Sequence, residues 1–277
     1  MTRPQPVWAS SALQVILEKV SMGEPVRSTS ILESSTMKLG ILECDHIPEN
    51  LRPRFISYKL VFERLLQPHA QKLTCVSYRV FTGEFPEHPD GCGGYLITGS
   101  ARSVYESEPW IERLEAYVRT LHQLRKPLIG ICFGHQMIAQ ALGGRTEKAA
   151  QGWGVGRQTY QVLETPAWLD SSPPEFSILA SHQDQVTELP DGATRLASSG
   201  FCKNAAFTLG DHVLSFQGHP EFTKEFSQGI LDLRREHYGE ELYASGVASL
   251  QHPIQAELVA SWMMQFLNTQ SEQTACA

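Results

Sequence analysis

The segment that most constrains the fold lies near the middle of the chain, at residues 127–136 (Pro-Leu-Ile-Gly-Ile-Cys-Phe-Gly-His-Gln). An apolar run leads into Cys132, which has a glycine two residues before it and another two residues after it. This pattern predicts a strand, a sharp turn and a helix, because side chains at Gly130 and Gly134 would clash where the helix passes its own strand. Cys132 then stands at the helix N-terminus, where free N–H groups and the helix dipole favour a thiolate. The alternative for a cysteine taken alone is a buried structural thiol.

Composition narrows the classes of partner and cofactor. The 277 residues are 42% hydrophobic and 19% charged, an ordinary globular profile. A net charge of −7 argues against nucleic acid and anionic membranes as partners, since both require a basic surface. The six cysteines are widely and irregularly spaced, so we expect no structural zinc site, and reduced thiols in a cytoplasmic protein. No motif in the sequence supports any other metal or an organic cofactor, and we expect neither. No apolar run approaches the roughly 20 residues needed to span a bilayer, and no secretory signal opens the chain.

The ends of the chain differ from its middle. Residues 1–36 include a polar stretch rich in serine and threonine, and Met37 directly precedes the first apolar strand. We therefore expect 1–36 to be either an extension or the product of a misplaced start. Residues 37–268 are predicted to form a single domain, and 269–277 a frayed tail.

From residue 37 the chain alternates apolar strands with amphipathic helices. Strands are expected at 38–43, 73–81, 94–100 and 127–131, and helices at 53–67, 109–125 and 134–142. The second half predicts short strands at 156–162, 176–180, 194–198, 204–208 and 212–216, with closing helices at 222–238 and 254–267. This order indicates an α/β fold, a doubly wound and mostly parallel sheet flanked by helices, with short antiparallel additions in the second half.

A second motif supplies a base for the thiol. His219 and Glu221 lie two residues apart at the end of a predicted strand. An extended segment places both side chains on one face, so Glu221 can orient the His219 ring and stabilise its charged form. Carboxyl ends of parallel strands meet at one edge of a sheet, which brings His219 to the same edge as Cys132. There the N–H of Phe133 points where an oxyanion would develop.

The two motifs together resemble the triad-type, class I glutamine amidotransferase family, whose fold is flavodoxin-like. The resemblance covers about residues 37–240 and implies Cys132 as nucleophile, His219 as acid and base, and Glu221 as its orienting partner. It further implies that the N–H of Gly99 joins that of Phe133 in an oxyanion hole.

The same resemblance suggests substrate contacts. It implies that Gln136 helps to hold the glutamyl moiety. The segment 181–184 (Ser-His-Gln-Asp) is similar to one in the amidotransferase domain of GMP synthetase. Its His182 and Asp184 either line the pocket or belong to a turn with a capping aspartate. Asp45 and His46 are expected at the same sheet edge, where Asp45 is more readily a helix cap than a substrate contact.

The chain departs from synthetases because it contains no ATP-activating segment. Its segment 40–45 (Gly-Ile-Leu-Glu-Cys-Asp) resembles more closely the stand-alone branch, which includes GMP synthase-like amidotransferases and γ-glutamyl peptidases. Three functions follow as alternatives: hydrolysis of a small γ-glutamyl substrate, a glutaminase subunit that delivers ammonia to a synthetase partner, and a non-catalytic binding module. The intact triad favours the first. A papain-like protease and a serine hydrolase are disfavoured by the position and the identity of Cys132.

Overall fold

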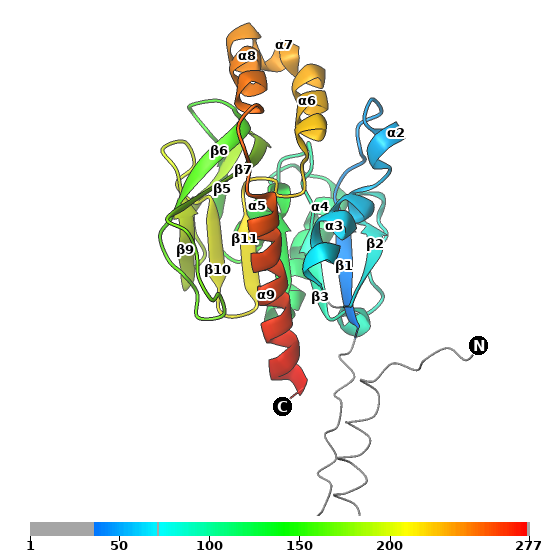
Figure 1. Ribbon diagram of the computed structural model, residues 1–277. Helices are drawn as coiled ribbons and strands as arrows, with labels where there is room; N and C mark the ends of the chain where they lie inside the picture. The colour runs from blue at the N-terminus through cyan, green and yellow to red at the C-terminus, as the bar shows by residue number, and fades with distance from the viewer. Residues whose placement is uncertain (1–35, 71, 276–277) are drawn as a thin grey trace, which may run out of the picture. The chain divides into compact units, whose positions relative to one another are not determined.

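The computed structural model describes residues 36–70 and 72–275, within which a nine-stranded sheet forms the centre of the fold (Figure 1). The strand order is β2-β1-β3-β4-β11-β10-β9-β6-β7. Strands β2, β1, β3, β4 and β11 are parallel, and beyond β11 the strands β10, β9, β6 and β7 each pair antiparallel with their neighbour. The predicted fold class is confirmed, including the antiparallel additions in the second half.

The strands have the following bounds: β1 Met37–Glu43, β2 Leu73–Arg79, β3 Gly94–Ile97, β4 Leu128–Ile131, β6 Gly154–Val162, β7 Glu175–His182, β9 Ala193–Ser198, β10 Ala206–Leu209 and β11 Val213–Phe216. A separate two-stranded sheet pairs β5 Arg145–Lys148 with β8 Asp184–Glu188. The sequence prediction missed this small sheet.

The helices are α2 Arg52–Phe55, α3 Tyr58–Leu66, α4 Pro109–Gln123, α5 Phe133–Ala141, α6 Lys224–Leu233, α7 Arg235–Tyr238, α8 Glu240–Ser249 and α9 Ala256–Ala275. Within the described residues, short 3-10 helices also lie at Gln67–His69, Val80–Thr82 and Pro89–Gly91. None of the helices in the described part of the chain is both long enough and apolar enough to cross a membrane.

Helices cover both faces of the sheet. In Figure 1, α3 and α9 lie in front of it and α4 and α5 behind it. The buried residues of α4 recur at helical spacing (Ile111, Leu114, Val118 and Leu121), so one apolar stripe faces the sheet. Leu39 and Ile41 of β1 lie in the hydrophobic core between the sheet and helices α3 and α9. Leu42 of the same strand lies in the core on the other face, with α4 and α5.

One predicted helix, 53–67, is wrong as a continuous element. The structure breaks it into α2 and α3 at Ile56, whose φ of 55° is outside the helical region. Ser57 then begins α3 by accepting a hydrogen bond from the N–H of Leu60 on its side-chain oxygen.

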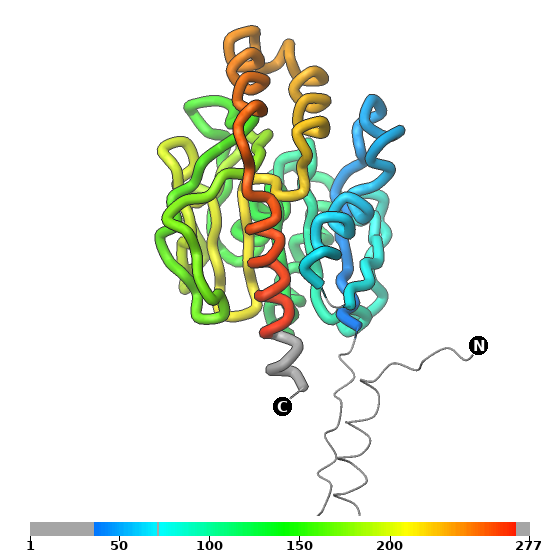
Figure 2. The backbone as a smooth tube through the Cα atoms, in the orientation of Figure 1, coloured from blue at the N-terminus to red at the C-terminus, as the bar shows by residue number. Residues whose placement is uncertain are grey.

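The last part of the chain also differs in detail from the prediction. The closing helix at 222–238 is divided into α6 and α7, and α8 follows without having been predicted. Figure 2 shows this segment leaving the sheet and returning into α9. Helix α9 continues to Ala275, beyond the predicted end at residue 267. The predicted domain limits stay predictions, and the proposed extension 1–36 lies almost wholly outside the described residues.

Candidate active site

Cys132 occupies a strained turn between β4 and α5. Its φ of 54° and ψ of −103° are rarely adopted by residues with a side chain. The neighbouring glycines make this turn sterically feasible. A Cβ at Gly134 would lie 2.3 Å from the carbonyl oxygen of Ile97, and one at Gly130 would lie 2.6 Å from the carbonyl oxygen of Gly134. The helix can therefore start directly beside the strand, with the thiol at its N-terminus.

The N–H groups of Gly99 and Phe133 are the two that the sequence predicts for an oxyanion hole. Neither the N–H of Gly99 nor that of Phe133 has a backbone acceptor among the described residues. A Cβ at Gly99 would be 2.9 Å from Cε1 of His219 and 3.7 Å from Cβ of Cys132, so Gly99 lies against both side chains. The loop after β3 thus lies close to the thiol, and a role of Gly99 in an oxyanion hole stays a prediction.

His219 and Cys132 are far apart in sequence but come from neighbouring strands. Strand β11 pairs with β4 in parallel, with Phe216 opposite Ile131, and the N–H of Cys132 donates to the carbonyl of Phe216 over 2.9 Å. His219 follows β11 by three residues, and its N–H donates to the carbonyl of Leu179 over 2.7 Å. Sheet pairing therefore delivers both side chains to one edge.

The His219 ring contacts both of its predicted partners. Its Nδ1 lies 2.8 Å from Oε1 of Glu221, and the ring lies beside the Cys132 side chain where both pack against Gly99. Burial lowers the pKa of His219, but the negative charges of Glu221 and Cys132 outweigh this and raise the pKa to about 10. The arrangement favours the charged, imidazolium form of His219.

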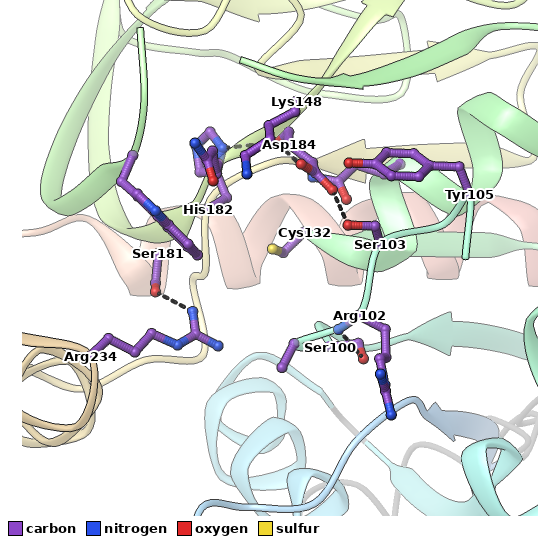
Figure 3. A pocket seen from close by; sticks show the side chains of 14 residues that line it. Ser100, Arg102, Ser103, Tyr105, Cys132, Lys148, Ser181, His182, Asp184 and Arg234 are labelled. Carbon is purple, nitrogen blue, oxygen red and sulfur yellow. Dashed lines mark hydrogen bonds between the residues drawn. The ribbon is translucent and has the colours of Figure 1, made fainter. Parts of the chain in front are cut away.

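The predicted substrate contacts line a cavity at the thiol (Figure 3). Gln136 donates from Nε2 to the carbonyl of Asp184 over 2.8 Å and to Oε1 of Gln217 over 3.1 Å. His182 ends β7 and Asp184 begins β8, so the segment 181–184 links two strands rather than forming a capped turn. The Asp184 carboxylate accepts a hydrogen bond from Oγ of Ser103.

His182 lines this cavity with a neutral ring. Its Nδ1 lies 3.1 Å from the carbonyl oxygen of Asp184, which can only accept, so Nδ1 carries the proton. Its Nε2 has no partner among the described residues. Burial lowers the pKa of His182 to about 4, which keeps the ring uncharged near neutral pH.

The expectation of a helix cap at Asp45 is wrong. One carboxylate oxygen of Asp45 accepts from the N–H of Ala101 over 2.9 Å, and the other from the N–H of His46 over 2.7 Å. Asp45 therefore ties the loop after β1 to the loop after β3. Both Asp45 and His46 line a second cavity that also reaches Cys132.

Several lining residues were missed by the sequence reasoning. Figure 3 shows Lys148 on the same side of Cys132 as His182 and Asp184, and Arg234 reaching toward Ser181. Arg234 lies between α6 and α7, and nothing in the sequence distinguishes it from its neighbour Arg235. Arg234 reaches the cavity because the end of α6 lies beside it.

The site has the geometry of a thiol hydrolase, and comparison with known proteins gives the family. The sequence model "Glutamine amidotransferase class-I" matches residues 60–232, more than half of the chain. The chain belongs to this family.

Individual proteins with similar sequences are consistent with membership of the class I glutamine amidotransferase family. "Gamma-glutamyl peptidase 3" of Arabidopsis thaliana is 36% identical over 163 residues, which cover 56% of this chain and 66% of that protein. One subunit of the glutamine-hydrolysing GMP synthase of Archaeoglobus fulgidus is 38% identical over 102 residues, covering 36% of this chain and 55% of that protein. The match with the γ-glutamyl peptidase thus spans just under two thirds of that protein's length, and the match with the GMP synthase subunit spans about half of that subunit's length.

A solved structure shows the same fold. The glutamine amidotransferase of Methylobacillus flagellatus has a TM-score of 0.67 to this chain at 20% identity, and the match covers 85% of this chain and 94% of that one.

Proposed function

We propose that the chain hydrolyses the C–N bond of a γ-glutamyl amide, either glutamine or a γ-glutamyl conjugate, through a glutamyl thioester on Cys132. The observation that carries the proposal is one buried imidazole, His219, that hydrogen-bonds the Glu221 carboxylate and lies beside the Cys132 side chain at Gly99. Family membership and the likeness to γ-glutamyl peptidases support it.

In the first step, the Cys132 thiolate attacks the γ-carbonyl carbon of the substrate. The carbonyl oxygen becomes negative and accepts hydrogen bonds from the N–H groups of Gly99 and Phe133. His219, as an imidazolium, then gives its proton to the leaving nitrogen while the C–N bond breaks. The products of this half-reaction are a neutral amine, a thioester on Cys132 and a neutral imidazole.

In the second step, His219 takes a proton from water, and the hydroxide formed attacks the thioester carbon. The C–S bond breaks, glutamate leaves, and the thiolate–imidazolium pair is restored. Glu221 keeps the ring oriented and stabilises its charge in both steps. On the acyl side, Gln136, His182 and Asp184 contact the glutamyl moiety.

The test is release of amine and of ammonia by the purified chain. Glutamine and a panel of γ-glutamyl amides are offered to the wild-type protein, to Cys132→Ala and to Cys75→Ala, whose buried thiol in β2 serves as a matched control. We expect turnover that Cys132→Ala abolishes and Cys75→Ala retains. Turnover by Cys132→Ala contradicts the mechanism.

The main alternative is a glutaminase subunit that delivers ammonia to a synthetase partner, which the likeness to the GMP synthase of Archaeoglobus fulgidus favours. It predicts no turnover of γ-glutamyl conjugates by the chain alone, with Cys132 still alkylated by an electrophilic glutamine mimic. A non-catalytic module predicts neither turnover nor selective alkylation. A cytoplasmic location, inferred from the cysteine usage, stays part of the proposal.

A further inference from the structure

Two cavities meet at Cys132. The first contains Gln136, Lys148, His182 and Asp184 and is here called the acyl cavity. The second contains Asp45, Glu49, Arg52, His219, Phe222 and Ile230 and is here called the amine cavity. Ser100, Ala101, Cys132, Ser181 and Arg234 line both.

The position of His219 decides which side receives the leaving group. This step rests on the proposed function, in which His219 protonates the leaving nitrogen. His219 lines the amine cavity and is absent from the lining of the acyl cavity. The nitrogen must lie within hydrogen-bonding reach of the ring when the C–N bond breaks, so the group attached to it extends into the amine cavity.

The amine cavity is too large for ammonia alone. Its volume is about 360 Å³, against about 160 Å³ for the acyl cavity. A single water-sized molecule such as ammonia needs only about 15 Å³ of such space. The room therefore fits a leaving amine with a substantial side group, for which Phe222, Ile230 and Leu233 provide an apolar wall.

Arg234 is the cation in this cavity that lacks a carboxylate partner. Its Nη1 donates to Oγ of Ser181 over 3.1 Å, and its guanidinium carbon lies 5.5 Å from the centroid of the Trp153 ring. Among the described residues no carboxylate forms an ion pair with it, whereas Arg52 pairs with Glu49 at 3.9 Å. A guanidinium held in this way presents a planar fork that suits a carboxylate.

The acidic residues of the cavity do not offset this preference. Both carboxylate oxygens of Asp45 already accept backbone N–H groups, and Glu49 lies beside Arg52. The acyl cavity has its own cation for the glutamyl carboxylate in Lys148, so Arg234 is not needed there.

We propose that the amine cavity receives an amino acid or short peptide, joined through its amino group to the γ-carboxyl of glutamate, and that Arg234 binds its free carboxylate. Arg234 is then a specificity-determining residue: it selects γ-glutamyl peptides over glutamine and over uncharged γ-glutamyl amides.

The experiment compares two substrates that differ only in this charge, γ-glutamylglycine and γ-glutamylglycinamide. The ratio of their kcat/KM values is measured for the wild-type protein, Arg234→Gln, Arg234→Lys and Arg235→Gln. Arg235 is a matched control because it is the next residue and pairs with Glu240 instead of facing the cavity. Unfolding curves verify that each variant is folded.

We expect the wild-type protein to favour the carboxylate substrate, and Arg234→Gln to lower the ratio by about 10-fold to 100-fold, the usual effect of losing a charge-assisted hydrogen bond. Arg234→Lys restores part of the ratio, and Arg235→Gln keeps it. An unchanged ratio in Arg234→Gln, or a wild-type ratio near one, overturns the inference.

The two proposals fail in different ways. Cys132-dependent cleavage of both substrates without preference refutes the role of Arg234 and leaves the proposed hydrolysis standing. If neither these substrates nor glutamine is cleaved, the proposed function itself is wrong. Should Arg234→Gln slow glutamine and both dipeptide substrates equally, Arg234 serves the acyl side or the fold, and the inference is refuted.

Discussion

The rings of His219 and Phe222 stack face to face, with centroids 3.9 Å apart and an interplanar angle of 8°. Phe222 is held in turn by Phe226, at 4.4 Å between centroids. The stack fixes the plane of the imidazole, and the Glu221 carboxylate fixes its rotation within that plane through Nδ1. The other ring nitrogen is thereby left for Cys132 and the leaving amine.

Phe222→Leu should lower kcat by about tenfold, because a ring free to tilt spends less time in the productive orientation. Loss of the stack should also lower the free energy of unfolding by about 1 kcal/mol. Phe226→Leu is the matched control, since Phe226 contacts Phe222 without being the stacking partner of His219. Steady-state kinetics should show a kcat defect only at position 222, and equal defects would refute a positioning role.

Stability should depend on pH through His219. Its pKa of about 10 in the folded protein lies above its ordinary value of 6.5, so between these values the folded state binds more protons than the unfolded state. The stabilisation is fully present below pH 6.5 and is lost as the pH rises through 10. Urea unfolding at pH 6, 8 and 10 should show the advantage of wild type over His219→Gln shrinking. A constant difference would contradict the elevated pKa, and the exposed His252→Gln is the control.

Gly134→Ala should be strongly destabilised. The added methyl would lie 2.3 Å from the carbonyl oxygen of Ile97, which is backbone and has no freedom to yield. We expect a loss of about 3 kcal/mol or more in the free energy of unfolding. Gly200→Ala, where no atom lies within 4 Å of the added methyl, should stay within about 0.5 kcal/mol. Similar unfolding midpoints for both variants would disprove the close helix–strand approach.

The strain at Cys132 should appear in a comparison of two inactive variants. Cys132→Gly is expected to be at least as stable as Cys132→Ala, because glycine adopts a φ of 54° without penalty. At Ala139, inside α5, replacement by glycine should instead cost about 1 kcal/mol. Denaturant titrations of the three variants and the wild type settle the order, and a clearly less stable Cys132→Gly would argue against strain.

The sharp turn at Cys132 was predictable because the residues that determine it are neighbours in the sequence. A glycine on each side of Cys132 indicates close packing of the helix on its strand, and the apolar run before it is typical of a buried strand. That His219 and Cys132 lie at the same edge of the sheet could also be predicted, because the carboxyl ends of parallel strands meet there. The pattern of strands and helices was therefore sufficient for the fold class and for placing the two motifs together.

Other features depend on contacts that no local pattern announces. Strand β5 has the sequence Arg-Thr-Glu-Lys, which becomes a strand only because β8 pairs with it. The break at Ile56 interrupts an otherwise continuous helical stripe, and α8 has no one-sided apolar face that would predict it. Arg234 reaches the site through the path of α6, which the sequence does not reveal.

The pairing of β4 with β11 has a consequence for the order of events during synthesis. The cysteine is translated long before the histidine and carboxylate that activate it, and the two halves meet only when the later strand docks beside the earlier one. The thiol therefore gains its acid–base partner only when β11 has paired with β4.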